Sequence, residues 1–370
     1  MTSLNDLYTE YGQSPWIDNI RRDWLVDGTL AKFVADGVRG VTSNPSIFAK
    51  ALATSTAYDQ LIEESSDDNA EDLFETLAVQ DVRDACDVLA KVHETSRSDF
   101  VAGRRRYLDG FVSLEVSPRL ARDTDGTIAA VKRLHAKVDR PNVMIKIPAT
   151  KEGLPAIRAT LGAGINVNVT LIFSLARYGD VIDAWTAGLR DAHEAGHDVS
   201  AIASVASFFV SRVDVAVDAL LPDGDPRRGT AANAQAAAAY VLYRTSVNGD
   251  VVASLLADGA QVQRPLWAST STKNPTYNDL LYVNCLVGDE TVNTMPDATL
   301  ADALDHPDFA SSYLLNKEST HAAAAELEKL SPDVDLDRVT EQLEDEGVAS
   351  FAKSYDDLLA TVSSKMRASK

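Results

Sequence analysis

The sequence predicts an α/β fold, a (β/α)8 TIM barrel with extra helices after the second strand and at the C-terminus. Two observations lead to this prediction. Eight short apolar runs bounded by turn residues follow one another, and helical patterns separate most of them, as in a parallel sheet with helices between its strands. Polar residues also stand at or near the ends of most runs, where such barrels carry their functional groups.

The expected strands are residues 15–19, 38–44, 111–116, 143–149, 166–172, 202–210, 265–270 and 281–287. A helix is expected between the third and fourth strands, because apolar residues recur at helical spacing from Ile128 to Val138. Another begins near Asp180, after the fifth strand. The alanine-rich stretch 231–244 predicts a helix before the seventh strand.

Two regions fall outside this alternation. Residues 59–94 carry about two helices between the second and third strands, and residues 299–370 have the pattern of several amphipathic helices. The expected inward side chains of the second region are Leu343, Val348, Phe351, Tyr355, Leu358 and Val362. We expect both regions to decorate one barrel domain spanning residues 1–370, since no linker divides the chain.

The composition, 45% hydrophobic and 24% charged residues, is typical of a soluble globular protein. No stretch approaches the ~20 apolar residues of a membrane span. The N-terminus does not resemble a secretory signal, and Cys86 and Cys285 form no disulfide framework, so a cytoplasmic protein is expected. The net charge of −20 disfavours binding to nucleic acid and anionic lipid, and an anionic substrate would need cations within its site.

Lys146 lies within 143–149, Val-Met-Ile-Lys-Ile-Pro-Ala, a strand expected to be buried on both faces. Burial lowers the pKa of an ammonium group from ~10.4, and a neutral amine is a nucleophile that condenses with carbonyls. This position therefore predicts Schiff-base catalysis. The alternative is a lysine at a strand end that reaches solvent or pairs with a carboxylate.

Other polar residues share the rim formed by the predicted strand ends: Asp18, Asn44, Glu115, Asn168, Thr170, Ser207, Ser271 and Lys273. Each alone has a structural explanation, such as a turn cap or a surface strand position. Their joint placement favours one shared site. No metal site is expected, because His193 and His197, the only histidines at a ligand spacing, lie at a polar, glycine-broken helix end.

The segments around these residues resemble the transaldolases, specifically the longer bacterial type, over nearly the whole chain. The resemblance is carried by residues 37–48, 109–118, 143–150, 165–173, 203–214 and 267–275. Separate blocks in the family's order are more specific than one motif. The resemblance implies a Schiff-base enzyme of sugar phosphates that requires neither a metal nor an organic cofactor, because the iminium itself accepts the electron pair.

The resemblance also implies roles for individual residues. Lys146 stands in the Schiff-base position. Glu115 and Thr170 match the pair that holds a catalytic water. Asp18 matches the acid/base that acts on the C4 hydroxyl of the substrate.

Further residues match substrate-binding positions of the family. Asn44, Asn168 and Ser207 match groups that hold the hydroxyls of the dihydroxyacetone moiety, and Arg212 matches a phosphate-binding arginine. The second cation departs from the pattern, because Lys273 stands where shorter relatives carry arginine. Lysine binds phosphate as a point charge without the bidentate fork of arginine. Its neighbour Ser271 belongs to the same expected substrate-binding segment.

The activity implied is transfer of a dihydroxyacetone unit in the pentose phosphate pathway. Its donor would be sedoheptulose 7-phosphate or fructose 6-phosphate, and its acceptor glyceraldehyde 3-phosphate or erythrose 4-phosphate. A rival activity is that of an aldolase that releases free dihydroxyacetone, although related fructose 6-phosphate aldolases typically carry tyrosine at the position of Phe209. A non-catalytic phosphosugar-binding barrel and an interaction protein are further candidate functions. The oligomeric state stays open; such barrels often form homodimers.

Overall fold

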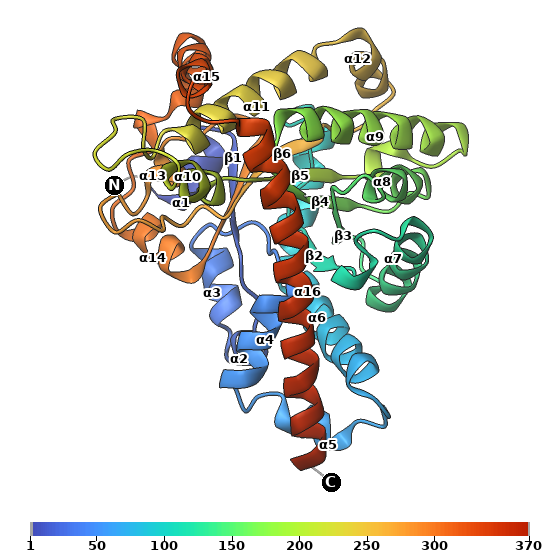
Figure 1. The fold of residues 1–370 in the computed structure, drawn as a ribbon. Coiled ribbons are helices and arrows are strands. Elements are labelled where there is room, and N and C mark those ends of the chain that lie inside the picture. The colour runs from blue at the N-terminus through green and yellow to red at the C-terminus, as the bar shows by residue number, and fades with distance from the viewer. Residues whose placement is uncertain (1–2, 369–370) are drawn as a thin grey trace.

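The computed structural model describes residues 3–368 and contains a parallel sheet curled into a barrel with helices around it (Figure 1). The strands are β1 (Gln13–Ile17), β2 (Val112–Glu115), β3 (Val143–Pro148), β4 (Val167–Ile172), β5 (Ser204–Phe209), β6 (Arg264–Ala268) and β7 (Thr291–Met295). Within the described residues they are hydrogen-bonded in the order β1-β7-β6-β5-β4-β3-β2. Their near-continuous burial agrees with a sheet covered on both faces.

The position between β1 and β2 is filled by a short segment around Val41. Val41 forms parallel bridges to Ile17 of β1 and to Val112 of β2. The amide of Ile17 donates to the carbonyl of Gly40 at 3.0 Å, and the amide of Ser113 donates to that of Val41 at 2.9 Å. These bonds close the sheet, and the predicted (β/α)8 class is confirmed.

The predicted strand 38–44 is therefore much shorter than expected. A Cβ atom on Gly40 would lie 2.3 Å from the ring of Trp16, so the backbone passes directly against that ring. Pro45 then begins the next helix. The close approach and this early helix limit the second strand to a bridge on either side of Val41.

The predicted strand 281–287 is wrong. Leu281–Asn284 forms the short helix α13, and the last strand is β7. A short apolar run is compatible with either a buried strand or a buried helical turn, and here the helical turn is found. The six remaining predicted strands agree with the structure to within two residues at each end.

The helices that precede β2 are α1 (Leu4–Thr9), α2 (Arg22–Asp27), α3 (Thr29–Ala35), α4 (Pro45–Thr54), α5 (Asp59–Glu64) and α6 (Ala70–Val101). The two helices expected over 59–94 correspond to α5 and α6. Asn69 caps α6 by accepting hydrogen bonds from the amides of Glu71 and Asp72. This cap explains why a long helix starts directly after the acidic turn.

The helices between the later strands are α7 (Thr124–Val138), α8 (Gly153–Gly162), α9 (Leu175–Glu194), α10 (Ser211–Asp218), α11 (Ala231–Val247), α12 (Asp250–Ala257) and α13. Short 3-10 helices are η1 (Pro118–Leu120), η2 (Val199–Ala201), η3 (Phe309–Ser311) and η4 (Tyr313–Leu315). The helices predicted over 128–138, near Asp180 and over 231–244 are confirmed as α7, α9 and α11. None of the described helices is long and apolar enough to cross a membrane.

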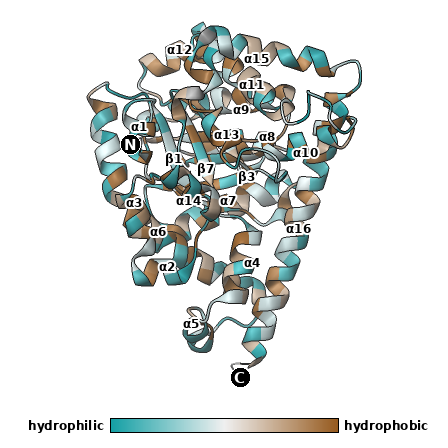
Figure 2. Ribbon diagram, turned by 90° about the vertical axis from the view of Figure 1, so that its left-hand side faces the viewer, coloured by the Kyte–Doolittle hydropathy of each residue, from teal (hydrophilic) through white to brown (hydrophobic). Residues whose placement is uncertain are grey.

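The C-terminal region forms α14 (Asp297–Asp305), α15 (Lys317–Leu330) and α16 (Leu336–Ala368). The 33-residue helix α16 crosses the barrel from the side of α11 and α15 to the neighbourhood of α5 (Figure 1). Hydrophobic and hydrophilic residues alternate along it (Figure 2). Its expected inward residues are buried, except for Val348, which is only partly buried.

Asp109 organises the amino-terminal end of the barrel interior. Its Oδ2 accepts hydrogen bonds from Ser14 Oγ at 2.5 Å and Arg39 Nε at 2.9 Å, and its Oδ1 accepts one from Trp16 Nε1 at 2.9 Å. The fully buried Arg264 lies 3.4 Å from Oδ1. Burial alone would raise the pKa of Asp109, but Arg264, Arg39 and the hydrogen bonds hold this pKa below its ordinary value.

We expect Asp109→Asn to lower the free energy of unfolding by about 3–5 kcal/mol, because Arg264 loses its buried counter-ion. Since the folded pKa of Asp109 is lowered, its contribution is present above the unfolded pKa of about 3.9 and is lost as the pH falls below it. Urea unfolding at several pH values measures both effects. Asp357→Asn, which removes an exposed partner of Lys353, should leave stability nearly unchanged. Equal losses for the two variants would contradict the role assigned to Asp109.

Candidate active site

A cavity of about 190 Å³ lies at the carboxyl ends of the barrel strands. All predicted site residues except Glu115 and Asn168 line it: Asp18, Asn44, Lys146, Thr170, Ser207, Phe209, Arg212, Ser271 and Lys273. Glu115 contacts Lys146, and Asn168 contacts Ser207. The structure therefore brings the whole predicted set together at one mouth of the barrel.

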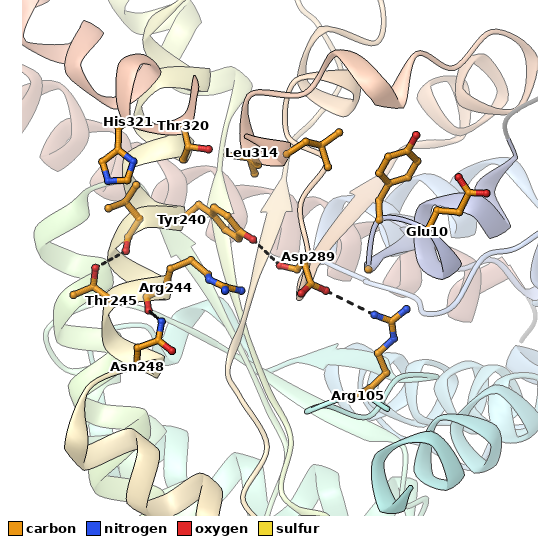
Figure 3. Close-up of a pocket in the computed structure, with 14 residues that line it drawn as sticks. Glu10, Arg105, Tyr240, Arg244, Thr245, Asn248, Asp289, Leu314, Thr320 and His321 are labelled. Atoms are coloured by element: carbon orange, nitrogen blue, oxygen red, sulfur yellow. Dashed lines mark hydrogen bonds and ion pairs between the residues drawn. The ribbon is translucent and has the colours of Figure 1, made fainter. Parts of the chain in front are cut away.

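A larger cavity of about 820 Å³ lies at the opposite end, beside the residues that precede β1, β2 and β7 (Figure 3). Its two arginines face carboxylates: Arg105 lies 3.7 Å from Asp289, and Arg244 lies 3.5 Å from Glu290. None of the predicted site residues lines it. Because (β/α)8 barrels carry their chemistry at the carboxyl ends of the strands, the smaller cavity is the candidate active site.

Lys146 lies inside the barrel and is only 5% exposed. Its Nζ is 3.2 Å from Glu115 Oε2 and donates a hydrogen bond of 3.1 Å to the carbonyl of Ser43. The parallel register pairs Lys146 on β3 with Glu115 on β2 and with Asn168 on β4, so these side chains project to the same face of the sheet. The lysine thus has a carboxylate partner and does not reach bulk solvent.

Two carboxyl groups interact with this lysine. Burial raises the pKa of Glu115, and Lys146 opposes that rise. Burial likewise raises the pKa of Asp18, against the opposing effects of Lys146 and of the hydrogen bond from Thr42 Oγ1 at 2.6 Å. Carboxyl groups with raised pKa values are suited to exchange protons at a pH closer to neutrality.

Asn168 and Ser207 form a buried hydrogen-bonded chain. Ser207 Oγ donates to Asn168 Oδ1 at 2.7 Å, and Asn168 Nδ2 donates to Ser113 Oγ at 3.0 Å. These bonds fix the orientation of the amide and leave the hydroxyl of Ser207 facing the cavity as an acceptor. Asn44 lies at the rim, where its side chain caps α4 by accepting from the amide of Ile47 at 3.1 Å.

Thr170 lies at an irregularity of β4. The register with β5 shifts between Val169 and Ile172, and Leu171 has a φ of 59°. The left-handed conformation costs a non-glycine residue about 1–2 kcal/mol, and such bulges re-aim side chains next to active sites. Thr170 Oγ1 is buried and has no hydrogen-bond partner among the described residues, so it is free to bind a ligand group.

Two cations line the same cavity. Burial lowers the pKa of Arg212, which stands in the first turn of α10, while Asp18 and Glu346 oppose this. Lys273 lies in the loop after β6, is exposed, and donates to Ser271 Oγ at 2.6 Å. Desolvation of its ammonium group and, to a smaller extent, the positive charge of Arg212 lower its pKa. Neighbouring cations of this kind provide a site for a phosphate or carboxylate.

Sequence reasoning missed several residues of the cavity: Thr42, Ser46, Ser269, Thr294 and Phe351. Thr42 Oγ1 contacts Asp18 and also lies 2.7 Å from Thr294 Oγ1. Thr42 could have been predicted from the sequence, because it stands two residues before Asn44 in the same expected strand and so projects from the same face. Thr294 was missed because its strand, β7, was not predicted. Phe351 was expected to face inward, but its place in the cavity was not foreseen.

The chain matches the family model described as "Transaldolase/Fructose-6-phosphate aldolase" over residues 15–362. It is 45% identical to a transaldolase of Saccharopolyspora erythraea over 98% of both chains. It is 47% identical to a transaldolase of Mycolicibacterium smegmatis over 97% of this chain and 96% of that relative. A transaldolase of Thiobacillus denitrificans is 46% identical over 95% of this chain and 97% of its own length.

Replacing Lys146 by methionine should raise the pKa of both Glu115 and Asp18, because the cation that opposes their desolvation is removed while the burial remains. Carbon-13 NMR titration of the side-chain carboxyls measures both pKa values. The matched control is Lys151→Met, which removes an exposed lysine directly beyond β3. Unchanged or lowered pKa values in the Lys146 variant would contradict the electrostatics described for this site.

Proposed function

The chain belongs to the transaldolase/fructose-6-phosphate aldolase family, and from this premise we propose that it transfers a dihydroxyacetone unit between sugar phosphates through a Schiff base on Lys146. The donor would be sedoheptulose 7-phosphate or fructose 6-phosphate, and the acceptor glyceraldehyde 3-phosphate or erythrose 4-phosphate, as in the pentose phosphate pathway. One observation supports the proposal most directly: the amine of Lys146 lies 3.2 Å from a buried carboxyl group, in a cavity that is also lined by two cationic side chains.

In the first step, Lys146 passes its proton to Glu115, and the resulting neutral amine attacks the C2 carbonyl of the ketose to form a carbinolamine. The carbinolamine must lose water, and Glu115 with its raised pKa is placed to supply the proton. We propose that a water held by Thr170 Oγ1 and Glu115 relays this proton, since both groups are buried beside the lysine. The product is an iminium on Lys146.

In the second step, Asp18 takes the proton of the C4 hydroxyl while the C3–C4 bond breaks. The electron pair of that bond moves to the iminium and forms an enamine, and the shorter aldose leaves. The enamine carbon then attacks the aldehyde of the acceptor, whose oxygen takes a proton from Asp18. Water hydrolyses the resulting iminium, which releases the new ketose and restores the amine of Lys146. The hydrogen bond from Thr42 Oγ1 holds Asp18 in position for both transfers.

The remaining polar groups bind the substrate. We assign the hydroxyls of the three-carbon unit to Asn44, Asn168 and Ser207, because the fixed orientation of the Asn168 amide suits a directional contact. Arg212 and Lys273 would hold the phosphate. Because the net charge of −20 repels an anionic substrate, these two side chains supply the local positive charge that attracts its phosphate.

The main competing function is that of an aldolase that releases free dihydroxyacetone to water. The phenylalanine at position 209, rather than the tyrosine typical of related aldolases, favours transfer. Incubation with fructose 6-phosphate and no acceptor separates the two, since rapid release of dihydroxyacetone would support the aldolase. The presence of the lysine and both carboxyls disfavours a barrel that only binds phosphosugars.

Lys146→Ala should lower kcat/KM by at least about a thousandfold, because the nucleophile is lost. Lys146→Arg should do no better, since guanidinium stays charged. Borohydride reduction in the presence of fructose 6-phosphate, followed by peptide mass spectrometry, should place the three-carbon adduct on Lys146 of the unmodified protein. Lys151→Ala is the matched control and should stay active. An adduct on another lysine would contradict the assignment.

Arg212→Ala should lower kcat/KM for fructose 6-phosphate by about 10- to 100-fold, the value of one charge-assisted contact. Unphosphorylated fructose, a donor without the phosphate, should be affected much less. Steady-state kinetics with both donors measure this difference. Arg140→Ala, at a partly exposed arginine paired with the exposed Asp87, serves as control. An equal loss with both donors would show that Arg212 does not hold the phosphate.

A further inference from the structure

The aromatic side chain of Phe351 enters the active cavity from outside the barrel. It is carried by α16 and is only 5% exposed. The centroid of its ring lies 5.6 Å from Lys146 Nζ and 5.9 Å from Arg212 Cζ. Among the described residues, it is the one member of α16 that lines this cavity. An apolar ring therefore covers both the proposed nucleophile and the proposed phosphate ligand.

The helix holds this ring in a fixed position. One turn before Phe351, Gly347 packs against the mouth, where an added Cβ would lie 3.1 Å from Leu171 and 3.4 Å from Phe173. One turn after it, Ser354 Oγ accepts a hydrogen bond of 2.8 Å from Ser46 Oγ at the rim of the cavity. Close packing on one side and a hydrogen bond on the other leave little freedom for the ring to move.

Solvent-accessible space adjoins the cavity on the side of α16. A groove of about 520 Å³ between α10 and α16 is lined by Arg212 and Lys273, which also line the active cavity. Leu343 and Glu346 of α16 form its other wall. The groove and the active cavity thus share both cationic residues. Water in the groove has access to the reacting centre unless a side chain of α16 blocks its way.

We propose that Phe351 is a specificity-determining residue that directs the covalent three-carbon intermediate to an aldose acceptor and keeps it from water. This inference rests on the proposed function. The enamine on Lys146 has two fates. In transfer, its C3 attacks the aldehyde carbon of the acceptor and the aldehyde oxygen takes a proton. Water then adds to C2 of the resulting iminium, the C–N bond breaks, and the new ketose leaves. In release, C3 takes a proton to give the iminium, water adds to C2, the C–N bond breaks, and dihydroxyacetone leaves with the amine protonated.

Both routes end with water adding to C2 of an iminium on Lys146, so they differ at C3: release requires a proton there, whereas transfer requires the aldehyde of the acceptor. A rigid aromatic ring beside Nζ therefore disfavours release, because an apolar surface over the enamine keeps away the water that would deliver a proton to C3. Removal of the ring would admit water from the groove to the enamine. The quantity that changes is the ratio of released to transferred dihydroxyacetone, rather than the overall rate alone.

The test measures this ratio with fructose 6-phosphate as donor and erythrose 4-phosphate as acceptor. In Phe351→Ala the ratio should rise about tenfold, and in Phe351→Leu it should rise less, because leucine keeps most of the apolar volume. Leu358→Ala is the matched control, since this fully buried leucine of the same helix does not line the cavity. It should lower stability and leave the ratio unchanged.

An unchanged ratio in both Phe351 variants would overturn the inference, as would an equal rise in Leu358→Ala, which would point to general loosening of α16. If Phe351→Ala does not fold, the ratio in Phe351→Leu decides. Failure of the proposed function looks different. In that case, borohydride traps no adduct on Lys146 of the unmodified protein, whereas a failed inference leaves trapping and transfer intact.

Discussion

The site depends on one buried ion pair, that of Lys146 with Glu115 at 3.2 Å. Neither group is favourable inside a barrel alone, since removing a single charge from water costs several kcal/mol after relaxation. The parallel register of β2 and β3 places the two side by side, so each offsets the desolvation of the other. Asp18 shares the same cation. The charge balance of the cavity therefore depends on strand register rather than on the conformation of loops.

The two ends of the barrel are built differently. At the amino end, Asp109 uses both of its oxygens in hydrogen bonds and pairs with the buried Arg264 and the partly buried Arg39. At the carboxyl end, Thr170 Oγ1 has no partner among the described residues, and Leu171 and Ser269 adopt positive φ values. The carboxyl end thus presents an unpaired hydroxyl where chemistry is expected, while Asp109 stabilises the fold at the amino end.

The sequence was informative where one local pattern specified the structure. Strands such as β3 and β5 were found because a parallel sheet covered on both faces requires continuous apolar runs. β7 was missed because its sequence, Thr-Val-Asn-Thr-Met, is largely polar and is held by pairing with distant strands. Phe351 was recognised as buried, but its contact with Lys146 depends on how α16 docks, which periodicity does not encode.

The closure at Val41 has a consequence for motion. Along β1, the junction with β7 contains five paired residues. The junction on the other side is shorter, with one bridge at Val41 and backbone hydrogen bonds from Arg39 to Pro15, Ile17 to Gly40 and Thr42 to Ile17. A shorter junction opens more readily in local fluctuations, so amide hydrogen exchange should be faster at this junction than between β1 and β7. Thr42 and Asn44 follow directly after it. Opening of this junction would therefore first displace Thr42, which orients Asp18, and Asn44, which borders the cavity, before the opposite wall of the barrel opens.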